Sequence, residues 1–260
     1  MCLLVLAWQV HPRYRLVVAA NRDEFHERPT AAMAKWPPPD DIIAGRDLRA
    51  GGTWLAMDRA RRFGIITNFR DLQGPTPGAP SRGNLIPNYL RNEAGASAHL
   101  QELQPSAGEY SGFNLLLTDN DSLWYASNRA EHFARPLPPG IYGLSNEFLD
   151  TPWPKLQRVR RRFDPLLMQG DEVSKDELFA ILSDPTQAGI NDKLPKTGVS
   201  PEWEQLLSSP FIRNEDYGTR CSTIVLLEPS GAVSLTERRF DSAGSVIADT
   251  QFSLHGDEWL

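Results

Sequence analysis

Cys2 follows the initiator methionine, so removal of Met1 leaves a chain that begins with a thiol and a free α-amine on one residue. Removal is normal when the second residue is small, as cysteine is. An α-amine has a pKa of about 7.7–8.0 and is partly a free base near neutrality. It can take the thiol proton directly or through one water, as in enzymes whose nucleophile pairs with its own N-terminal amine. Cys2 is therefore a candidate nucleophile; the alternative is a small apolar residue of a buried strand.

The residues after Cys2 predict a β-hairpin that positions it. Two short apolar runs flank a polar turn at Pro12 and Arg13, where the proline fixes φ and lacks an N–H donor; the runs are residues 3–10 and 16–20. Antiparallel pairing around this turn places Cys2 opposite Asp23, to within about one residue.

The same hairpin brings the polar cluster Asn21-Arg22-Asp23-Glu24 to the end of the sheet where Cys2 begins. Asp23 is expected to orient the ammonium group and balance its charge, and Arg22 to favour the thiolate. Asn21 and Glu24 are expected to bind substrate or to support these groups.

The run LVVAANRDEFHERP, with Cys2 ahead of it, resembles the NRDE family, also called the transport and Golgi organisation protein 2 family. Further segments resemble the family in the same order, from residue 1 to about residue 240. They are GGTWLAM (51–57), TNFRD (67–71), RGNLIPNYL (82–90), GFNLLLTD (112–119), YGLSNEFLDTPWPKL (142–156), YGTRCSTIVLL (217–227) and TER (236–238).

The resemblance implies a fold and an activity. The family is similar to the N-terminal nucleophile (Ntn) hydrolases, and especially to cysteine amidases such as penicillin V acylase and bile salt hydrolase. It implies a four-layer αββα sandwich, in which two antiparallel sheets are flanked by helices. The family has also been linked to the handling of haem and of acyl-CoA or lipid, which implies a binding role as the alternative.

Two asparagines close predicted strands, Asn68 after Gly-Ile-Ile-Thr and Asn146 after Tyr-Gly-Leu-Ser. Attack of a thiolate on an amide carbonyl creates an oxyanion, which a neutral side-chain amide can stabilise through its N–H groups. By resemblance, GLSNEF looks like the amidase segment with the oxyanion asparagine, and TNF like a second segment with a strand-end asparagine. Asn146 is thus the first predicted oxyanion donor and Asn68 the second. The alternative is that each bonds its own backbone.

Arg220 begins a predicted core strand and looks like the late active-site arginine of the cysteine amidases. Burial of its charge would require a counter-ion, for which Asp23 or Glu24 is expected. The alternative is an ordinary arginine in solvent. The amidases carry an arginine a few residues before their aspartate, whereas Arg22 directly precedes Asp23 and, by strand alternation, points to the opposite face.

The composition argues against several classes of protein. A formal charge of −6 and a pI near 5.4 do not suit a nucleic-acid surface. No apolar stretch approaches the roughly 20 residues of a membrane-spanning helix, and residues 3–10 lack the flanks of a signal peptide. A bond between Cys2 and Cys221 would cap the nucleophile, so free thiols in a reducing cytoplasm are expected.

Cofactor motifs are missing from the sequence. The five histidines include no pair at ligand spacing and no C-x-x-C occurs, so no metal site is predicted. There is no phosphate-binding loop, dinucleotide glycine fingerprint, G-x-S-x-G elbow or C-x-x-C-H haem attachment motif. No cofactor is therefore predicted, although noncovalent haem would need only one exposed axial ligand.

Strands that arrive mostly as hairpins, with helices grouped between them, predict antiparallel sheets flanked by helices, an α+β fold, in a single domain over residues 1–260. Residues 71–83 hold prolines and glycines and form a lid or an inert loop. Residues 59–62 are expected at a solvated hairpin tip. The arginines of a predicted helix over 153–168 form a solvated face or an anchor for phosphate or CoA.

The leading hypothesis is a cytoplasmic hydrolase of a carbon–nitrogen amide or thioester bond in a small acyl substrate. Cys2 is its nucleophile, Asp23 orients the amine, Asn146 and Asn68 stabilise the oxyanion, and Arg220 balances charge. The alternative is a non-catalytic binding or trafficking protein for an amphipathic ligand such as haem or acyl-CoA.

Overall fold

The computed structural model describes residues 2–70, 76–170, 172–256 and 258–259, with Cys2 described through its backbone. The chain folds into two compact units, each assembled from segments far apart in the sequence. The first unit comprises residues 1–27, 139–145 and 149–258, and the second comprises residues 28–138, 146–148 and 259–260. Whether the two act as the predicted single domain stays a prediction.

The first unit is built on a six-stranded antiparallel sheet with the strand order β10-β1-β2-β11-β12-β13. Its strands are β1 (Cys2–Trp8), β2 (Leu16–Phe25), β10 (Gly140–Leu144), β11 (Tyr217–Leu227), β12 (Val233–Phe240) and β13 (Val246–Leu254). Its helices are α3 (Pro154–Leu166), α4 (Lys175–Leu182) and α5 (Pro201–Leu206).

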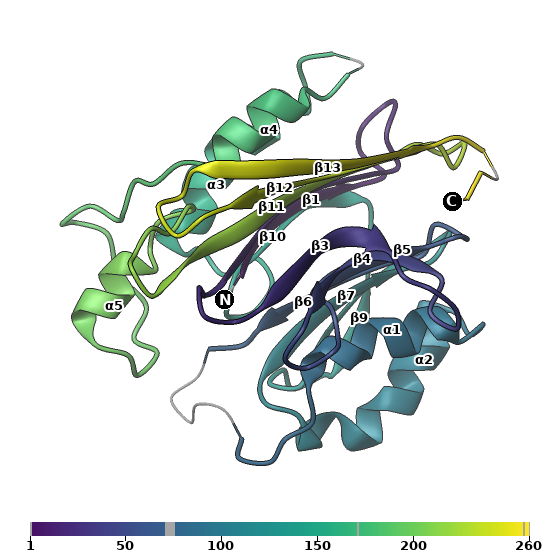
Figure 1. Cartoon of the computed structure of the whole chain (residues 1–260), viewed down its shortest axis with the longest axis horizontal. Coiled ribbons are helices and arrows are strands. Elements are labelled where there is room, and N and C mark those ends of the chain that lie inside the picture. Colours follow the sequence, from purple (N-terminus) through teal and green to yellow (C-terminus); the bar gives the residue numbers. More distant parts are fainter. Residues whose placement is uncertain (1, 71–75, 171, 257, 260) are drawn as a thin grey trace. The chain divides into compact units, whose positions relative to one another are not determined.

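Helices α3 and α4 pack on one face of this sheet (Figure 1). The odd-numbered residues of β1 and β2, such as Val5 and Ala19, form a core with Phe163 of α3 and Leu178 of α4. Even-numbered residues such as Leu4 are also fully buried. Both faces of β1 are therefore apolar, which explains why its sequence is a continuous apolar run and not an alternating one.

The β1–β2 hairpin sets which residues share a face. Trp8 pairs with Leu16 and Cys2 pairs with Arg22, one residue from the predicted partner Asp23. The connection, residues 9–15, has an odd number of residues, so the turn centres on Pro12 and not between Pro12 and Arg13. Because side chains alternate along a strand, this shift by one residue exchanges the two faces.

The second unit is built on a seven-stranded antiparallel sheet with the strand order β3-β4-β5-β6-β7-β8-β9. Its strands are β3 (Thr30–Lys35), β4 (Ile42–Asp47), β5 (Leu55–Asp58), β6 (Phe63–Asn68), β7 (Phe113–Thr118), β8 (Leu123–Ser127) and β9 (Ala134–Leu137). Its helices are α1 (Leu85–Arg91) and α2 (Ala96–Leu103), with short 3₁₀ turns η1 (Arg82–Asn84) and η2 (Gln104–Glu109).

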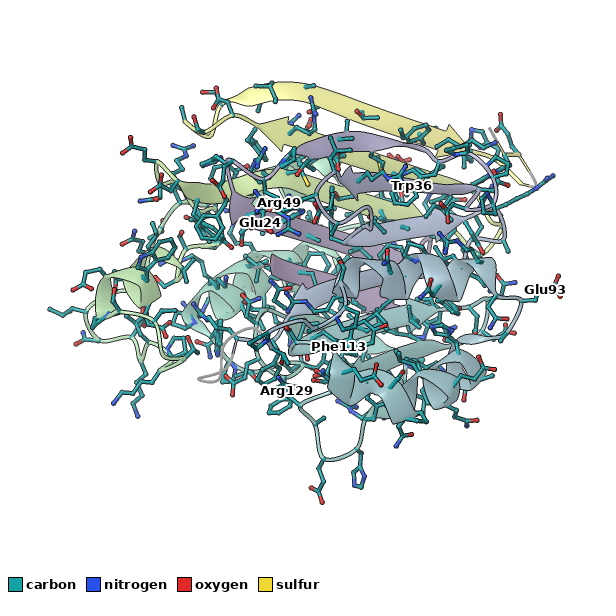
Figure 2. All side chains as sticks on the ribbon, turned by 60° about the horizontal axis from the view of Figure 1, so that its bottom comes forward. Glu24, Trp36, Arg49, Glu93, Phe113 and Arg129 are labelled. Carbon is teal, nitrogen blue, oxygen red and sulfur yellow. The ribbon has the colours of Figure 1, made fainter. Side chains whose placement is uncertain are left out.

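Helices α1 and α2 pack on one face of the seven-stranded sheet (Figure 1). Phe113 of β7 is labelled in Figure 2. With Ile66 of β6 it forms a core against Ile86 of α1 and Leu100 of α2. Gly95 is the N-cap of α2 and follows the end of α1 at Arg91. The predicted α+β fold, with antiparallel sheets flanked by helices, is confirmed.

Backbone contact between two glycines fixes the start of α1. The N–H of Thr53 donates to the carbonyl of Gly83 at 2.9 Å. A Cβ on Gly52 would lie 2.3 Å from the carbonyl carbon of Gly83, so only glycine permits this approach. The family segments that begin at residues 51 and 82 thus meet through their main chains.

The basic residues at 59–62 do not form the solvated tip that the sequence suggested. Arg61 is 4% exposed. Arg62 Nε donates to Asp58 Oδ2 at 2.7 Å, and its Nη2 donates to the carbonyl of Leu90 at 2.6 Å, at the end of α1. The prediction was wrong for these two residues because the hairpin tip packs against α1, where the guanidinium satisfies helix C-terminal carbonyls.

Within the described part of the chain, no helix is long and apolar enough to cross a membrane.

Candidate active site

A row of paired strand positions carries the candidate nucleophile. Cys2 of β1 pairs with Arg22 of β2, Arg22 pairs with Cys221 of β11, and Cys221 pairs with Arg239 of β12. Directly paired residues share a sheet face, so these four positions lie on the face opposite to α3 and α4. The observed register therefore places Arg22, and not Asp23, on the face of position 2.

The two cysteine positions are separated by strand β2. Adjacent strands lie about 4.8 Å apart, so the two α-carbons are about 10 Å apart. A disulfide requires α-carbons within about 7 Å. Cys221 is buried and forms no disulfide bond with any described residue, and a bond between these two positions would require the sheet to break.

Asp23 lies on the face covered by α3 and is 1% exposed. Thr219 Oγ1 donates to Asp23 Oδ1 at 2.7 Å and accepts from the N–H of Ile212 at 3.0 Å. Burial raises the pKa of the Asp23 carboxyl, and the positive charge of Lys155 and the bond from Thr219 oppose that rise. The side chain is thus held in one orientation beside a buried cation.

Lys155 was missed by the sequence analysis. It is 1% exposed and is the second residue of α3, after Pro154. A positive charge is unfavourable at a helix N-terminus and in an apolar core, so its burial depends on a nearby negative charge, which Asp23 supplies. The available signal was its position one helical turn before Val159, which places Lys155 on the apolar stripe of the helix.

The side-chain amide of Asn21 forms hydrogen bonds that connect β2 to neighbouring segments. Its Nδ2 donates to the carbonyls of Leu182 and Pro210, both at 2.9 Å, and its Oδ1 accepts from Ser222 Oγ at 2.6 Å. These bonds satisfy both donors of the buried amide. Asn21 therefore has the geometry of a support for Asp23 two residues further along the strand.

Arg220 is the extra residue of a bulge between Thr219 and Cys221, which removes it from the regular alternation of β11. Its Nη1 donates to the carbonyls of Phe25, at 2.8 Å, and of His26, at 3.2 Å. Burial and the positive charge of Arg22 lower the pKa of Arg220, while Cys221 and Glu24 act in the opposite direction.

Glu24, which Figure 2 labels, is the residue before the last of β2. Its ion-pair partner is Arg22. The two side chains form an ion pair, with Arg22 Nη2 3.8 Å from Glu24 Oε2. Arg22 is only 6% exposed. Of the predicted residues, the first unit therefore contains Cys2, the cluster 21–24 and Arg220.

Asn68 and Asn146, the predicted oxyanion donors, come together in the second unit. The side chain of Asn146 is fully buried and donates from Nδ2 to the carbonyl of Asn68 at 2.9 Å, and the backbone carbonyl of Asn146 accepts from the N–H of Arg70 at 2.8 Å. Asn114 of β7, which the sequence analysis did not select, donates to the carbonyl of Glu147 at 2.9 Å. The segment 146–148 is thus fastened to the ends of β6 and β7.

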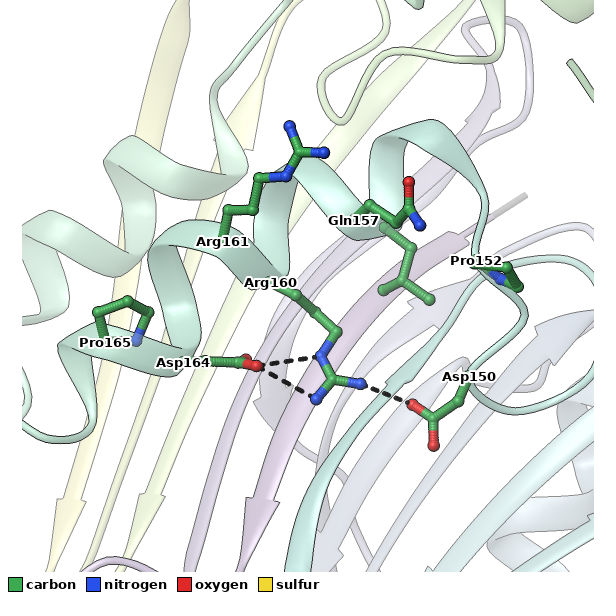
Figure 3. Close-up of a pocket in the computed structure, with 8 residues that line it drawn as sticks. Asp150, Pro152, Gln157, Arg160, Arg161, Asp164 and Pro165 are labelled. Carbon is green, nitrogen blue, oxygen red and sulfur yellow. Dashed lines mark hydrogen bonds and ion pairs between the residues drawn. The ribbon is translucent and has the colours of Figure 1, made fainter. Parts of the chain in front are cut away.

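The arginine-rich helix α3 does not present a concentrated positive charge. Arg158 lies 3.7 Å from Asp184, and Arg160 pairs with Asp150 and Asp164, each at 3.2 Å. Figure 3 shows the guanidinium of Arg160 between these two carboxylates, in a surface pocket of about 460 Å³. The pairing favours the interpretation as a solvated face over a phosphate anchor.

The expected lid at residues 71–83 lies partly outside the described residues. From residue 76 onward the segment is hydrogen-bonded to the rest of the second unit, since the N–H of Thr76 donates to Ser111 Oγ at 2.9 Å. Arg82 Nη1 donates to the carbonyl of Gly112 at 2.7 Å. A lid function stays a prediction.

A solved structure of a mutant of the conjugated bile acid hydrolase from Clostridium perfringens is similar to this chain, with a TM-score of 0.51 and 8% sequence identity. The similarity covers 97% of this chain and 92% of that one. At this identity it shows the fold alone, and the fold is that of the Ntn hydrolases.

The sequence comparisons identify the family. The model of the family Transport and Golgi organisation 2 matches residues 1–242. The Transport and Golgi organization 2 homolog of Mus musculus and that of Homo sapiens are each 32% identical over 257 residues, covering 92% of this chain and 92% of the relative. The chain belongs to the Transport and Golgi organisation 2 family, which confirms the resemblance seen in the sequence.

Proposed function

We propose that this protein is a hydrolase with an N-terminal cysteine nucleophile that cleaves a carbon–nitrogen amide or thioester bond in a small acyl substrate. The observation that supports it best is the pairing of position 2, the first residue of β1, with Arg22 in a chain with the Ntn-hydrolase fold. A buried guanidinium favours a nearby thiolate over the neutral thiol. An ordinary core cysteine would gain nothing from such a neighbour.

The proposed reaction begins once Met1 has been removed. The α-amine of Cys2 takes the proton of its own thiol, and the sulfur attacks the substrate carbonyl to form a tetrahedral oxyanion. When this collapses, the carbon–nitrogen bond breaks and the α-ammonium returns the proton to the leaving amine. Water, deprotonated by the same α-amine, then attacks the thioester, and the acid leaves with Cys2 restored.

The other residues are assigned supporting roles in this proposal. Asp23, with Lys155 and Thr219 around it, orients the α-ammonium. Asn146 and Asn68 donate hydrogen bonds to the oxyanion, where removal of one donor typically costs about 100- to 1,000-fold in kcat. A reducing cytoplasm suits this chemistry, because a nucleophilic thiol must stay reduced.

The test is hydrolysis of a panel of acyl amides and acyl thioesters by the wild type, Cys2→Ser and Cys221→Ser. The proposal predicts turnover of at least one substrate, a loss of more than about 1,000-fold in Cys2→Ser, and little change in Cys221→Ser. Equal activity in the wild type and Cys2→Ser would overturn it. Tight binding of haem or acyl-CoA by Cys2→Ser, with no turnover by the wild type, would instead support the carrier function.

A further inference from the structure

Three arginines lie near the bulge of β11, beside the row of paired strand positions 2, 22, 221 and 239. Arg22 and Arg239 occupy the row itself. Arg220 is the extra residue of the bulge in β11, the strand between β2 and β12, and the charges of Arg22 and Arg239 both act on it. Glu24 pairs with Arg22, so at least part of the positive charge of this group is balanced.

Arg239 differs from the other two in its partners. Across the described residues it forms no ion pair, and its buried Nε has no hydrogen-bond acceptor. The next residue back along the strand, Arg238, points to the helical face and forms two bonds to Asp249, at 2.9 and 2.8 Å. A buried N–H group without an acceptor is destabilising, so this arrangement suits a site that an anion completes.

We infer that Arg239, together with Arg220, binds an anionic group of the substrate. This inference rests on the proposed hydrolase function and specifies its substrate class: acyl amides or thioesters that carry a carboxylate or phosphate. Arginine suits this role because its planar fork donates paired hydrogen bonds to either group.

The register also sets the separation between the anion and the scissile bond. Position 239 is three strands away from position 2, which is about 14 Å between α-carbons. Even with the arginine side chain extended along the sheet, its guanidinium would lie several bond lengths from a carbonyl at Cys2. The acid group therefore belongs several atoms away from the scissile carbonyl, as in a dicarboxylic acid monoamide, and not on the adjacent carbon.

The test compares two matched probes, the p-nitroanilide of adipic acid with its second carboxylate free and the same compound as its methyl ester. The inference predicts that the wild type prefers the free acid in kcat/KM. Arg239→Met should lower kcat/KM for the free acid by about 10- to 100-fold and leave the methyl ester unchanged. Arg239→Lys should recover part of the loss, and Arg238→Met is the matched control on the other face.

Equal losses for both probes, or no preference in the wild type, would overturn the inference. A second measurement separates it from the proposed function. Calorimetric titration of Cys2→Ala and of Cys2→Ala with Arg239→Met, using adipate and inorganic phosphate, reports the anion site without turnover. Binding that depends on Arg239 supports the anion site even if no substrate is hydrolysed, and it identifies which acid the site prefers. Binding of neither acid, or binding that does not change in the Arg239→Met variant, contradicts the inference.

Discussion

Arg22 is the residue whose role changes most when the structure is considered. Strand alternation separates it from Asp23, and the observed register places it opposite Cys2. We therefore expect Arg22→Met to slow alkylation of Cys2 by iodoacetamide at pH 7 by about 3- to 10-fold, because the thiolate loses a nearby positive charge.

Rapid-quench mass spectrometry of the alkylated N-terminal peptide measures this rate. Arg22→Lys keeps the charge and should react nearly as fast as the wild type. Arg161→Met, on the exposed side of α3, controls for the general loss of an arginine. An unchanged rate in Arg22→Met would contradict the assigned role.

The pair formed by Asp23 and Lys155 predicts a pH dependence of stability. Burial raises the pKa of Asp23 in the folded protein, so this carboxyl binds more protons when folded than when unfolded. Its stabilising contribution is complete below the ordinary value of 3.8 and is lost as the pH rises through the folded pKa. Lys155→Met removes a charge that holds this pKa down, so its destabilisation should be larger at pH 8 than at pH 5.

Urea unfolding at the two pH values measures this difference. The loss at pH 8 should reach about 3–5 kcal/mol, the range found when one member of a buried ion pair is removed. Lys193→Met, at an exposed position, should change stability little at either pH. A loss of the same size at both pH values would show that Lys155 does not act through Asp23.

At the scale of elements, the hairpin tip between β5 and β6 is a structural connection to α1. Arg62 bonds both Asp58 and the end of α1, and its guanidinium lies 5.2 Å from the centre of the Tyr89 ring. Arg62→Met would leave the buried carboxylate of Asp58 without this cation, so we expect a loss of about 3–5 kcal/mol in the free energy of unfolding.

Chemical denaturation with tryptophan fluorescence measures this loss. Burial already raises the pKa of Asp58 against the effect of Arg62, so acid should reduce the difference between variant and wild type as this carboxyl is protonated. Arg59→Met, at the exposed neighbouring position, is the control. Equal stability of Arg62→Met and the wild type would contradict the account.

The elements also show what a sequence can and cannot predict. Gly95 between two helical stretches, and the turn residues 119–122 between two apolar runs, are local signals, and each separates two elements of the structure. Strand β3 has no comparable signal, because an edge strand of half-exposed residues beside prolines lacks an alternating pattern. Membership in the wider family was predictable, because its motifs extend along most of the chain.

The candidate site was less predictable than the fold, for two physical reasons. Whether Cys2 pairs with Arg22 or with Asp23 depends on a shift of one residue in the register, which the seven-residue connection 9–15 sets. The backbone of Gln9 in this connection adopts a positive φ of 53°. Lys155 becomes relevant only through packing of α3 on the sheet, which joins residues more than 100 positions apart. Long-range burial leaves little trace in local sequence.

At the scale of the whole molecule, the chain has the Ntn-hydrolase fold, and the first strand of its six-stranded sheet begins at Cys2, directly after Met1. This strand carries the candidate nucleophile and lies in the interior of the six-stranded sheet. The central claim is that the α-amine of Cys2 serves as the base, which requires that Met1 be removed.

Intact-protein mass spectrometry, before and after incubation with the acyl amide panel and an iodoacetamide probe, tests this claim most directly. The account predicts a mass that lacks Met1, and rapid alkylation or a transient acyl adduct on Cys2 but not on Cys221. A retained Met1 would remove the base from the mechanism and contradict the account. A free Cys2 that reacts no faster than an ordinary thiol would contradict it as well.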